Sequence, residues 1–405
     1  MPIEPGKSPV STPSEQPHGD EASSSTCPNP ATSGPSLLSD CTSDQERRFA
    51  DAFHLLEVGI AQRAFPGASL AITQRGKLLA CKAFGHFTYA DAAEQPSPPV
   101  TCQTAWDLAS LTKPIATTSM AMLLWQREQL PLDARVVTLL PEFANPAGTA
   151  PKWRELVTVR MLLAHSSGLP AHRKLYLERT GRQAILAAAL SIPLAFPPMT
   201  RVEYSDIGFL VFGELLERVA AESLSTFCQR EVFAPLKLNF AFSPDLTAPQ
   251  AVPPTVIDTD FRHRIVQGEV NDENASAMGG VGGHAGLFGD ILSVATFAEC
   301  LLHGGAPVFQ PRSVELFTTR QLRPTGTSRA LGWDTPSIPS QSGIRFSARS
   351  FGHLGYTGTS LWCDPERGLS VTLLTNRTWP DARNQAIKQV RPALHDAIVR
   401  ALPKP

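Results

Sequence analysis

The chain has 405 residues, of which 42% are hydrophobic, so it is long enough to form one large two-lobed domain or two smaller ones. Its formal net charge of −1 provides no overall field that would attract nucleic acid or an anionic membrane, and neither partner is expected. No apolar run reaches the roughly 18 residues of a membrane-spanning helix, so membrane insertion is not expected either.

The first 44 residues differ in composition from the rest of the chain. They are rich in Pro and Ser and have no apolar clusters, which predicts a disordered tail before a folded domain over residues 45–405. They also lack the basic start and apolar segment of a secretory signal, which favours a cytoplasmic location. The seven cysteines are scattered without a Cys-x-x-Cys pair, which indicates reduced thiols rather than a disulfide framework or a zinc site.

The first folded elements are a helix and a strand pair. Apolar residues recur at helical spacing from Gln45, and the helix is expected to end before Phe65. Residues 68–73 and 78–83 are short apolar runs around the turn Arg75-Gly76, which predicts a β-hairpin.

The middle of the chain is mainly helical in pattern, and the end returns to strands. Helices are expected at 120–129, 159–164, 182–191 and 207–221. Strands are expected at 359–363 and 369–375, before a final helix at 381–401. Strands at both ends with helices between them predict an α+β fold, in which a helical lobe at roughly 115–290 is inserted into one antiparallel sheet flanked by helices. The site is expected in the cleft between sheet and lobe.

The first indication of catalytic chemistry is a serine, Ser110, three residues before a lysine, Lys113. A helix starting near Ser110 would place the Lys113 amine on the same face as the Ser110 hydroxyl. A serine hydroxyl needs such a base nearby to become a nucleophile, and burial can lower the pKa of a lysine enough for that task. Ser110 as a simple helix cap is the alternative interpretation.

Two further segments support the chemical interpretation. Tyr204-Ser205-Asp206 opens the predicted helix at Ile207, where a phenol could pair with Lys113 and relay a proton. Tyr204 as a core aromatic residue is the alternative. Gly352-His353-Leu354-Gly355-Tyr356 precedes the predicted strand at 359–363, and its glycines would let the backbone approach a substrate closely.

Together, Ser110-x-x-Lys113, Tyr204-x-Asp206 and His353-x-Gly355 resemble the three motifs of serine β-lactamases and penicillin-binding proteins, in the same order. The similarity begins near Gln45, continues to the end of the chain, and is greatest to the class C-like branch, which includes esterases and D-alanyl-D-alanine carboxypeptidases. The resemblance implies that Ser110, Lys113 and Tyr204 are catalytic, that the backbone N–H groups of Ser110 and Tyr356 form the oxyanion hole, and that Asp206, His353 and Gly355 bind substrate.

The sequence departs from the family pattern at three positions. Asp206 stands where Asn is usual, and its charge could hold Lys113 protonated. His353 and Leu354 stand where many members have Lys and Thr, which hold a substrate carboxylate. Small uncharged esters are therefore expected to be better substrates than carboxylated β-lactams at pH 8, with a smaller difference near pH 6 as His353 gains a proton. Arg345 or Arg349 could supply the missing charge.

Several polar residues near these motifs have open roles. His165 is expected to be a structural hydrogen-bonding residue, and His284 either lines the cleft or caps a turn. Asp272, Glu273 and Asn274 either brace a loop or orient a substrate, and bracing is favoured.

The sequence therefore predicts an acyl-enzyme serine hydrolase without a metal or organic cofactor, acting on a small-molecule or peptide substrate. The favoured activity is that of a carboxylesterase. A D-alanyl-D-alanine carboxypeptidase, a β-lactamase and a non-catalytic binding protein that uses the cleft are the alternatives. The sequence gives no indication of the oligomeric state.

Overall fold

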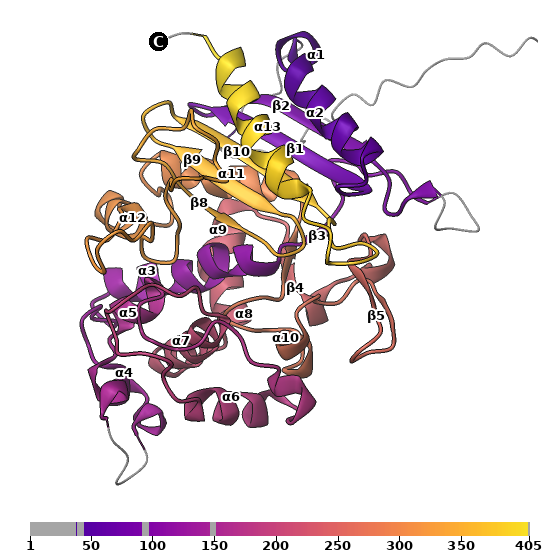
Figure 1. Cartoon of the computed structure of the whole chain (residues 1–405). Helices are drawn as coiled ribbons and strands as arrows, with labels where there is room; N and C mark the ends of the chain where they lie inside the picture. The colour runs from indigo at the N-terminus through magenta and orange to yellow at the C-terminus, as the bar shows by residue number, and fades with distance from the viewer. Residues whose placement is uncertain (1–37, 39–43, 91–96, 146–150, 404–405) are drawn as a thin grey trace, which may run out of the picture. The chain divides into compact units, whose positions relative to one another are not determined.

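The two ends of the folded chain meet in one antiparallel sheet. The computed structural model describes residues 38, 44–90, 97–145 and 151–403, so the predicted tail lies outside the described residues except for Leu38 and Asp44. The five strands have the order β2-β1-β10-β9-β8. Their bounds are β1 Gly67–Gln74, β2 Lys77–Gly85, β8 Phe351–Leu354, β9 Ser360–Asp364 and β10 Leu369–Thr375. The N-terminal hairpin thus pairs with the C-terminal strands through β1 and β10 (Figure 1).

Helices cover both faces of this sheet. On one face lie α1 (Gln45–Arg48), α2 (Ala50–Ala61) and the long C-terminal helix α13 (Ile387–Ala401), as Figure 1 shows. Aromatic and aliphatic side chains of α2 and α13 pack against β1, β2 and β10 in one buried cluster. Helix α11 (Ile291–Leu302) contacts β1, β9 and β10. This arrangement confirms the predicted α+β class with an antiparallel sheet flanked by helices.

The segment between β2 and β8 contains most of the helices. Besides α11, they are α3 (Ser119–Gln126), α4 (Val136–Leu139), α5 (Val159–Leu163), α6 (Arg182–Ser191), α7 (Asp206–Ala220), α8 (Leu224–Cys228), α9 (Ala234–Leu236), α10 (Glu273–Ala277) and α12 (Pro311–Thr318). Helix α7 is buried along most of its length and packs against α5 and α6. Among the described residues, no helix is both long and apolar enough to cross a membrane.

Two small sheets accompany these helices. One has the order β3-β7-β4, with β3 at Trp106–Asp107, β4 at Phe240–Phe242 and β7 at Leu287–Gly289. The other is a ribbon of β5 (Val256–Asp258) and β6 (Arg264–Val266). Neither small sheet was expected from the sequence. The first matters for the site, because β3 leads directly into the turn that carries Ser110.

Three element predictions need correction. The expected N-terminal helix ends before Phe65 as predicted, but it is interrupted at Phe49 and so forms two helices. The expected helix at Ser110 is a single 3₁₀ turn followed by a wider π-helical segment, Lys113–Thr118, before α3 begins. The last helix begins at Ile387 instead of Asp381, because the carbonyls of Ala382 and Asn384 accept hydrogen bonds from an arginine side chain and cannot start a helical ladder.

The remaining strand predictions are confirmed. The hairpin strands pair in antiparallel register from Gly67–Gly85 to Gln74–Lys77, with one irregularity between Ile72 and Thr73. Cys228, Cys300 and Cys363 are buried thiols without a disulfide bond. Cys27 and Cys41 lie outside the described residues.

Candidate active site

The turn after β3 presents Ser110. Ala109 adopts a left-handed backbone conformation with φ of 48°, which is uncommon for a residue with a side chain and reverses the chain sharply at this point. The carboxylate of Asp107 accepts a hydrogen bond from the Ala109 N–H at 2.8 Å and one from the Asn271 N–H at 2.6 Å. Asp107 therefore fixes the serine turn and ties it to Asn271, two residues before α10 begins.

Lys113 lies directly beside the serine. Its buried amine donates to Ser110 Oγ at 2.8 Å, so the three-residue spacing makes the predicted contact although the helix type differs. The amine also donates to the backbone oxygen of His284 at 3.0 Å and lies 2.7 Å from Asp206 Oδ1. Three acceptors surround one amine, which matches the three donors of an ammonium group.

The charge state of Lys113 follows from these neighbours. Burial alone would lower the pKa of Lys113, but the Asp206 carboxylate and the Tyr204 phenol outweigh that cost and raise the pKa above its ordinary value. Lys113 is therefore an ammonium in the resting protein at neutral pH. Aspartate at position 206, where the family usually has asparagine, thus favours the protonated form of Lys113, as the sequence suggested.

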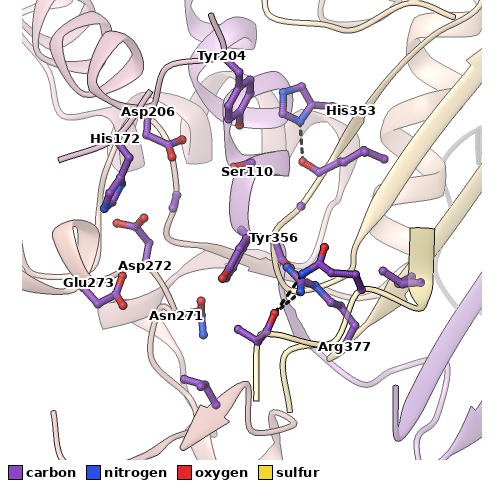
Figure 2. A pocket seen from close by; sticks show the side chains of 18 of the residues that line it. Ser110, His172, Tyr204, Asp206, Asn271, Asp272, Glu273, His353, Tyr356 and Arg377 are labelled. Atoms are coloured by element: carbon purple, nitrogen blue, oxygen red, sulfur yellow. Dashed lines mark hydrogen bonds between the residues drawn. The ribbon is translucent and has the colours of Figure 1, made fainter. Parts of the chain in front are cut away.

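Tyr204 completes the group around the serine. It lies just before α7, whose first turn is capped by the Ser205 side chain accepting from the Gly208 N–H. Its ring centroid is 4.9 Å from Lys113 Nζ and 4.6 Å from the ring of His165. Burial raises the pKa of Tyr204, Lys113 opposes that rise, and Asp206 adds to it. In the view of Figure 2, Ser110 lies between Tyr204 and Tyr356.

The turn between β8 and β9 faces Ser110 from the sheet. Within the described residues, the backbone N–H groups of Ser110 and Tyr356 make no hydrogen bond, so both are available as oxyanion donors. Two threonines bind this turn to the serine segment: Thr357 Oγ1 donates to the Asp107 carbonyl at 2.8 Å, and Thr359 Oγ1 donates to the Leu108 carbonyl at 3.0 Å. The two candidate donors are thus held by one hydrogen-bond network.

Gly355 and Arg377 shape the same turn. A Cβ on Gly355 would lie 2.7 Å from the Leu108 carbonyl and would also clash with the Thr359 side chain, so glycine is needed for this close approach. The Arg377 Nε donates to the Tyr356 carbonyl at 2.7 Å, and its guanidinium lies 4.5 Å from the Tyr356 ring centroid. Arg377 therefore holds the peptide that follows the Tyr356 donor.

His353 lines the cavity but does not supply a charge. Its Nδ1 donates to the Leu354 carbonyl at 2.9 Å, while its buried Nε2 has no hydrogen-bond partner among the described residues (Figure 2). Burial, together with Lys113 and Arg329, holds the pKa of His353 well below its ordinary value. The expectation that His353 gains a proton near pH 6 was therefore wrong, because the sequence did not reveal its burial or its two cationic neighbours.

The other polar residues mostly brace the site. His165 Nδ1 accepts from the Ser205 N–H at 3.0 Å, and burial keeps its pKa well below the ordinary value. The Asn274 side chain accepts from the Tyr176 N–H and donates to the Arg173 carbonyl. These contacts make His165 and Asn274 structural residues, as the sequence favoured.

Asp272 and His284 form a pair behind Lys113. His284 Nε2 lies 2.8 Å from Asp272 Oδ1, and the same oxygen accepts from the Ala275 N–H and caps α10. His284 is buried and does not line the cavity, whereas Asp272 and Glu273 do. His284 therefore contacts the residues around Ser110 only through its backbone carbonyl, which accepts a hydrogen bond from the Lys113 amine.

All the predicted site residues except Lys113, which lies behind Ser110, line one cavity of about 630 Å³. Ser110, Tyr204, Asp206, His353, Gly355 and Tyr356 all contribute to its wall. Sequence reasoning missed Asp107, Arg329 and Arg377, and it placed possible charges at Arg345 and Arg349 instead. Neither of those two arginines lines this cavity. Within the part of the chain that the structure describes, no cluster of His, Cys, Asp or Glu forms a metal site.

A serine hydroxyl that is hydrogen-bonded to a buried lysine and lines a cavity is the arrangement of a serine hydrolase. The Beta-lactamase family model matches residues 52–394, and the chain belongs to this family.

Named relatives and solved structures agree with this assignment. The chain is 31% identical over 343 residues to an N-acetylmuramyl-L-alanine amidase of Bacillus subtilis, with 77% of each chain covered. It is 28% identical to a putative D-alanyl-D-alanine carboxypeptidase of Escherichia coli, covering 77% of this chain and 79% of that protein. The fold is similar to that of EstCE1, a hydrolase with promiscuous acyltransferase activity, with a TM-score of 0.72 and 20% identity over 88% of this chain and all of the other.

Replacing Asp206 by asparagine is expected to shift the acidic limb of the kcat/KM profile to lower pH. The Asp206 charge raises the pKa of both Lys113 and Tyr204, and the reaction needs one of them to have lost its proton. Without that charge, the deprotonated form appears at lower pH. Profiles of wild type and Asp206→Asn with a neutral ester would check this, and an unchanged or upward-shifted limb would contradict it.

Proposed function

We propose that the protein hydrolyses small carboxylic esters, and more slowly the corresponding amides, through an acyl-enzyme on Ser110. The observation that carries this proposal is the hydrogen bond between Ser110 Oγ and the Lys113 amine, which lies beside the Tyr204 ring. The names of the relatives support bond cleavage at a carbonyl, since one is called an amidase, another a carboxypeptidase and a structural neighbour a hydrolase.

In the first half of the reaction, the Ser110 oxygen attacks the substrate carbonyl carbon and its proton passes to the Lys113–Tyr204 pair, which must first have lost one proton. The N–H groups of Ser110 and Tyr356 stabilise the oxyanion of the tetrahedral intermediate. When the intermediate collapses, the bond to the leaving group breaks, and the pair returns the proton to the departing oxygen or nitrogen. The acyl group remains bound to Ser110.

In the second half, water attacks the acyl-enzyme and the same groups act in the same order. The water gives a proton to the Lys113–Tyr204 pair, the two backbone donors stabilise the second oxyanion, and the proton passes to Ser110 Oγ as the acid is released. Ordered contacts of Thr357 and Thr359 with the serine segment keep both donors in place throughout.

A parallel assay tests the proposal with a short-chain nitrophenyl ester, a chromogenic cephalosporin and a D-alanyl-D-alanine peptide. The ester should be hydrolysed by the wild type well above the rate of the Ser110→Ala variant. Ester turnover that the variant retains in full, or no turnover of any of the three, would contradict the proposal. The second of these results, without covalent labelling of Ser110, would favour a non-catalytic binding protein.

A further inference from the structure

We propose that Cys81 and Cys102 form a redox-active pair, in which a peroxide oxidises Cys102 and Cys81 then closes a disulfide bond with it. Cys81 lies in β2, and Cys102 lies four residues before β3. Neither cysteine lines the cavity that contains Ser110, so this modification site is separate from the proposed hydrolysis.

The backbone brings the two cysteines to the same edge of the sheet. Strand β2 is the outer strand, and the Phe87 N–H just beyond its end donates to the Pro98 carbonyl at 3.0 Å. The Val100 N–H donates to the Gly85 carbonyl, also at 3.0 Å. The two segments are antiparallel, because the partner falls from residue 87 to residue 85 as the chain advances from 98 to 100. The chain that follows Val100 therefore runs back along β2 toward Cys81.

The side chains of the pair meet beside this edge. The Cys81 side chain is buried, and Cys102 packs against the same hydrophobic cluster. The two thiols are hydrogen-bonded to each other. The chain next to Cys102 is also fixed, because Ser69 Oγ on β1 donates to the Thr101 carbonyl at 3.3 Å. A disulfide bond requires two sulfur atoms that are already close, and this pair meets that condition.

Cys102 is the member of the pair that an oxidant reaches first. Its side chain is partly exposed, whereas Cys81 is only 4% exposed. The hydrogen bond from Cys81 lowers the pKa of Cys102, although burial and the Asp290 carboxylate act in the opposite direction. A lower pKa means more thiolate at neutral pH, and the thiolate is the form that reacts with a peroxide. An accessible, reactive cysteine beside a second cysteine is the arrangement of thiol redox sites.

Three other described cysteines provide internal references. Cys228, Cys300 and Cys363 are buried, and burial raises the pKa of Cys300 to about 12. Burial also raises the pKa of Cys228 and of Cys363. Thiols of this kind remain protonated at neutral pH and react slowly with peroxides. Oxidation is therefore expected at Cys102 and not at these three positions.

The proposed oxidation has two balanced steps. In the first, the Cys102 thiolate attacks one oxygen of hydrogen peroxide, the O–O bond breaks, and Cys102 becomes a sulfenic acid as hydroxide leaves. In the second, the Cys81 sulfur attacks the Cys102 sulfur and the S–O bond breaks. The departing hydroxide takes the Cys81 proton and forms water. The disulfide then joins β2 to the segment that leads through β3 to the Ser110 turn.

The test treats the reduced, full-length protein with hydrogen peroxide, beside a parallel sample of glutathione as a reference thiol. Remaining thiols are then alkylated in denaturant, and the cysteine peptides are mapped by mass spectrometry. The Cys81 and Cys102 peptides should be joined, with the loss of two hydrogen atoms, and dithiothreitol should separate them. Cys102 should be oxidised at least about tenfold faster than Cys300.

Single variants distinguish the two roles. Cys81→Ala should stop the reaction at the Cys102 sulfenic acid, which dimedone traps. Cys102→Ser should leave Cys81 reduced, because Cys102 is the residue that the oxidant reaches. Cys300→Ala is the matched control, since it changes a buried thiol outside the pair, and it should form the same disulfide as the wild type.

A bond from Cys102 to a different cysteine, or oxidation of Cys300 before Cys102, would overturn the inference. A pair that stays reduced after the glutathione sample has been fully oxidised would overturn it as well. All of these results are read from peptide masses, so they leave the proposed hydrolysis at Ser110 unaffected.

Discussion

Replacing Ser110 by alanine is expected to lower kcat/KM for a nitrophenyl ester by about 10⁴-fold or more, to a level close to the background reaction. The variant keeps the backbone N–H at position 110, which we propose as an oxyanion donor, and the Lys113–Asp206 ion pair, but it has no side-chain oxygen to form the acyl-enzyme. Steady-state kinetics with freshly purified protein would measure the loss.

The thermal midpoint serves as the control for this variant. Ser110 accepts one hydrogen bond from Lys113, whose other two acceptors remain in the variant, so the fold should be retained. A folded Ser110→Ala protein with near-wild-type turnover would show that another residue attacks the substrate.

Replacing Lys113 is expected to lower kcat by about 10²- to 10⁴-fold, the ordinary range for removal of a general base. Lys113→Met is more informative than Lys113→Ala, because methionine fills most of the buried volume that alanine would leave empty. The loss should appear with a neutral ester and mainly in kcat, since Lys113 contacts the serine and does not itself line the cavity.

The matched control for this variant is a lysine outside the site. Lys152→Met changes an exposed lysine whose carboxylate neighbour, Glu155, lies 3.8 Å away on the surface, and activity should be unchanged. A loss of less than threefold in a folded Lys113→Met protein would mean that the base lies elsewhere.

The sequence predicted the sheet better than the turn that carries the serine. Short, nearly continuous apolar runs between turns indicate β1, β2, β9 and β10, because strands covered by helices on both faces of a sheet are buried along their whole length. The 3₁₀ turn and π-helical segment around Lys113 have no such periodic signal. Their geometry depends on tertiary contacts such as the Asp107 carboxylate on the Ala109 N–H.

The site residues also fall into two groups: those that short sequence motifs reveal, and those that only the fold brings to the site. The three motifs could be read from spacing within a few residues, and they do converge on one cavity. Arg329 and Arg377 had no local signal, because the contacts that place them at the site are with residues distant in the sequence: the Tyr204 ring for Arg329 and the Tyr356 carbonyl for Arg377. The burial of His353 was equally invisible, and it determines whether that residue carries a charge.

The central claim is that Ser110 is the residue that becomes acylated. Intact-mass measurement after incubation with a fluorophosphonate, followed by peptide mapping, tests it most directly. The wild type should gain one adduct located on Ser110, and Ser110→Ala should gain none. An adduct on a different residue, or equal labelling of the wild type and Ser110→Ala, would contradict the account.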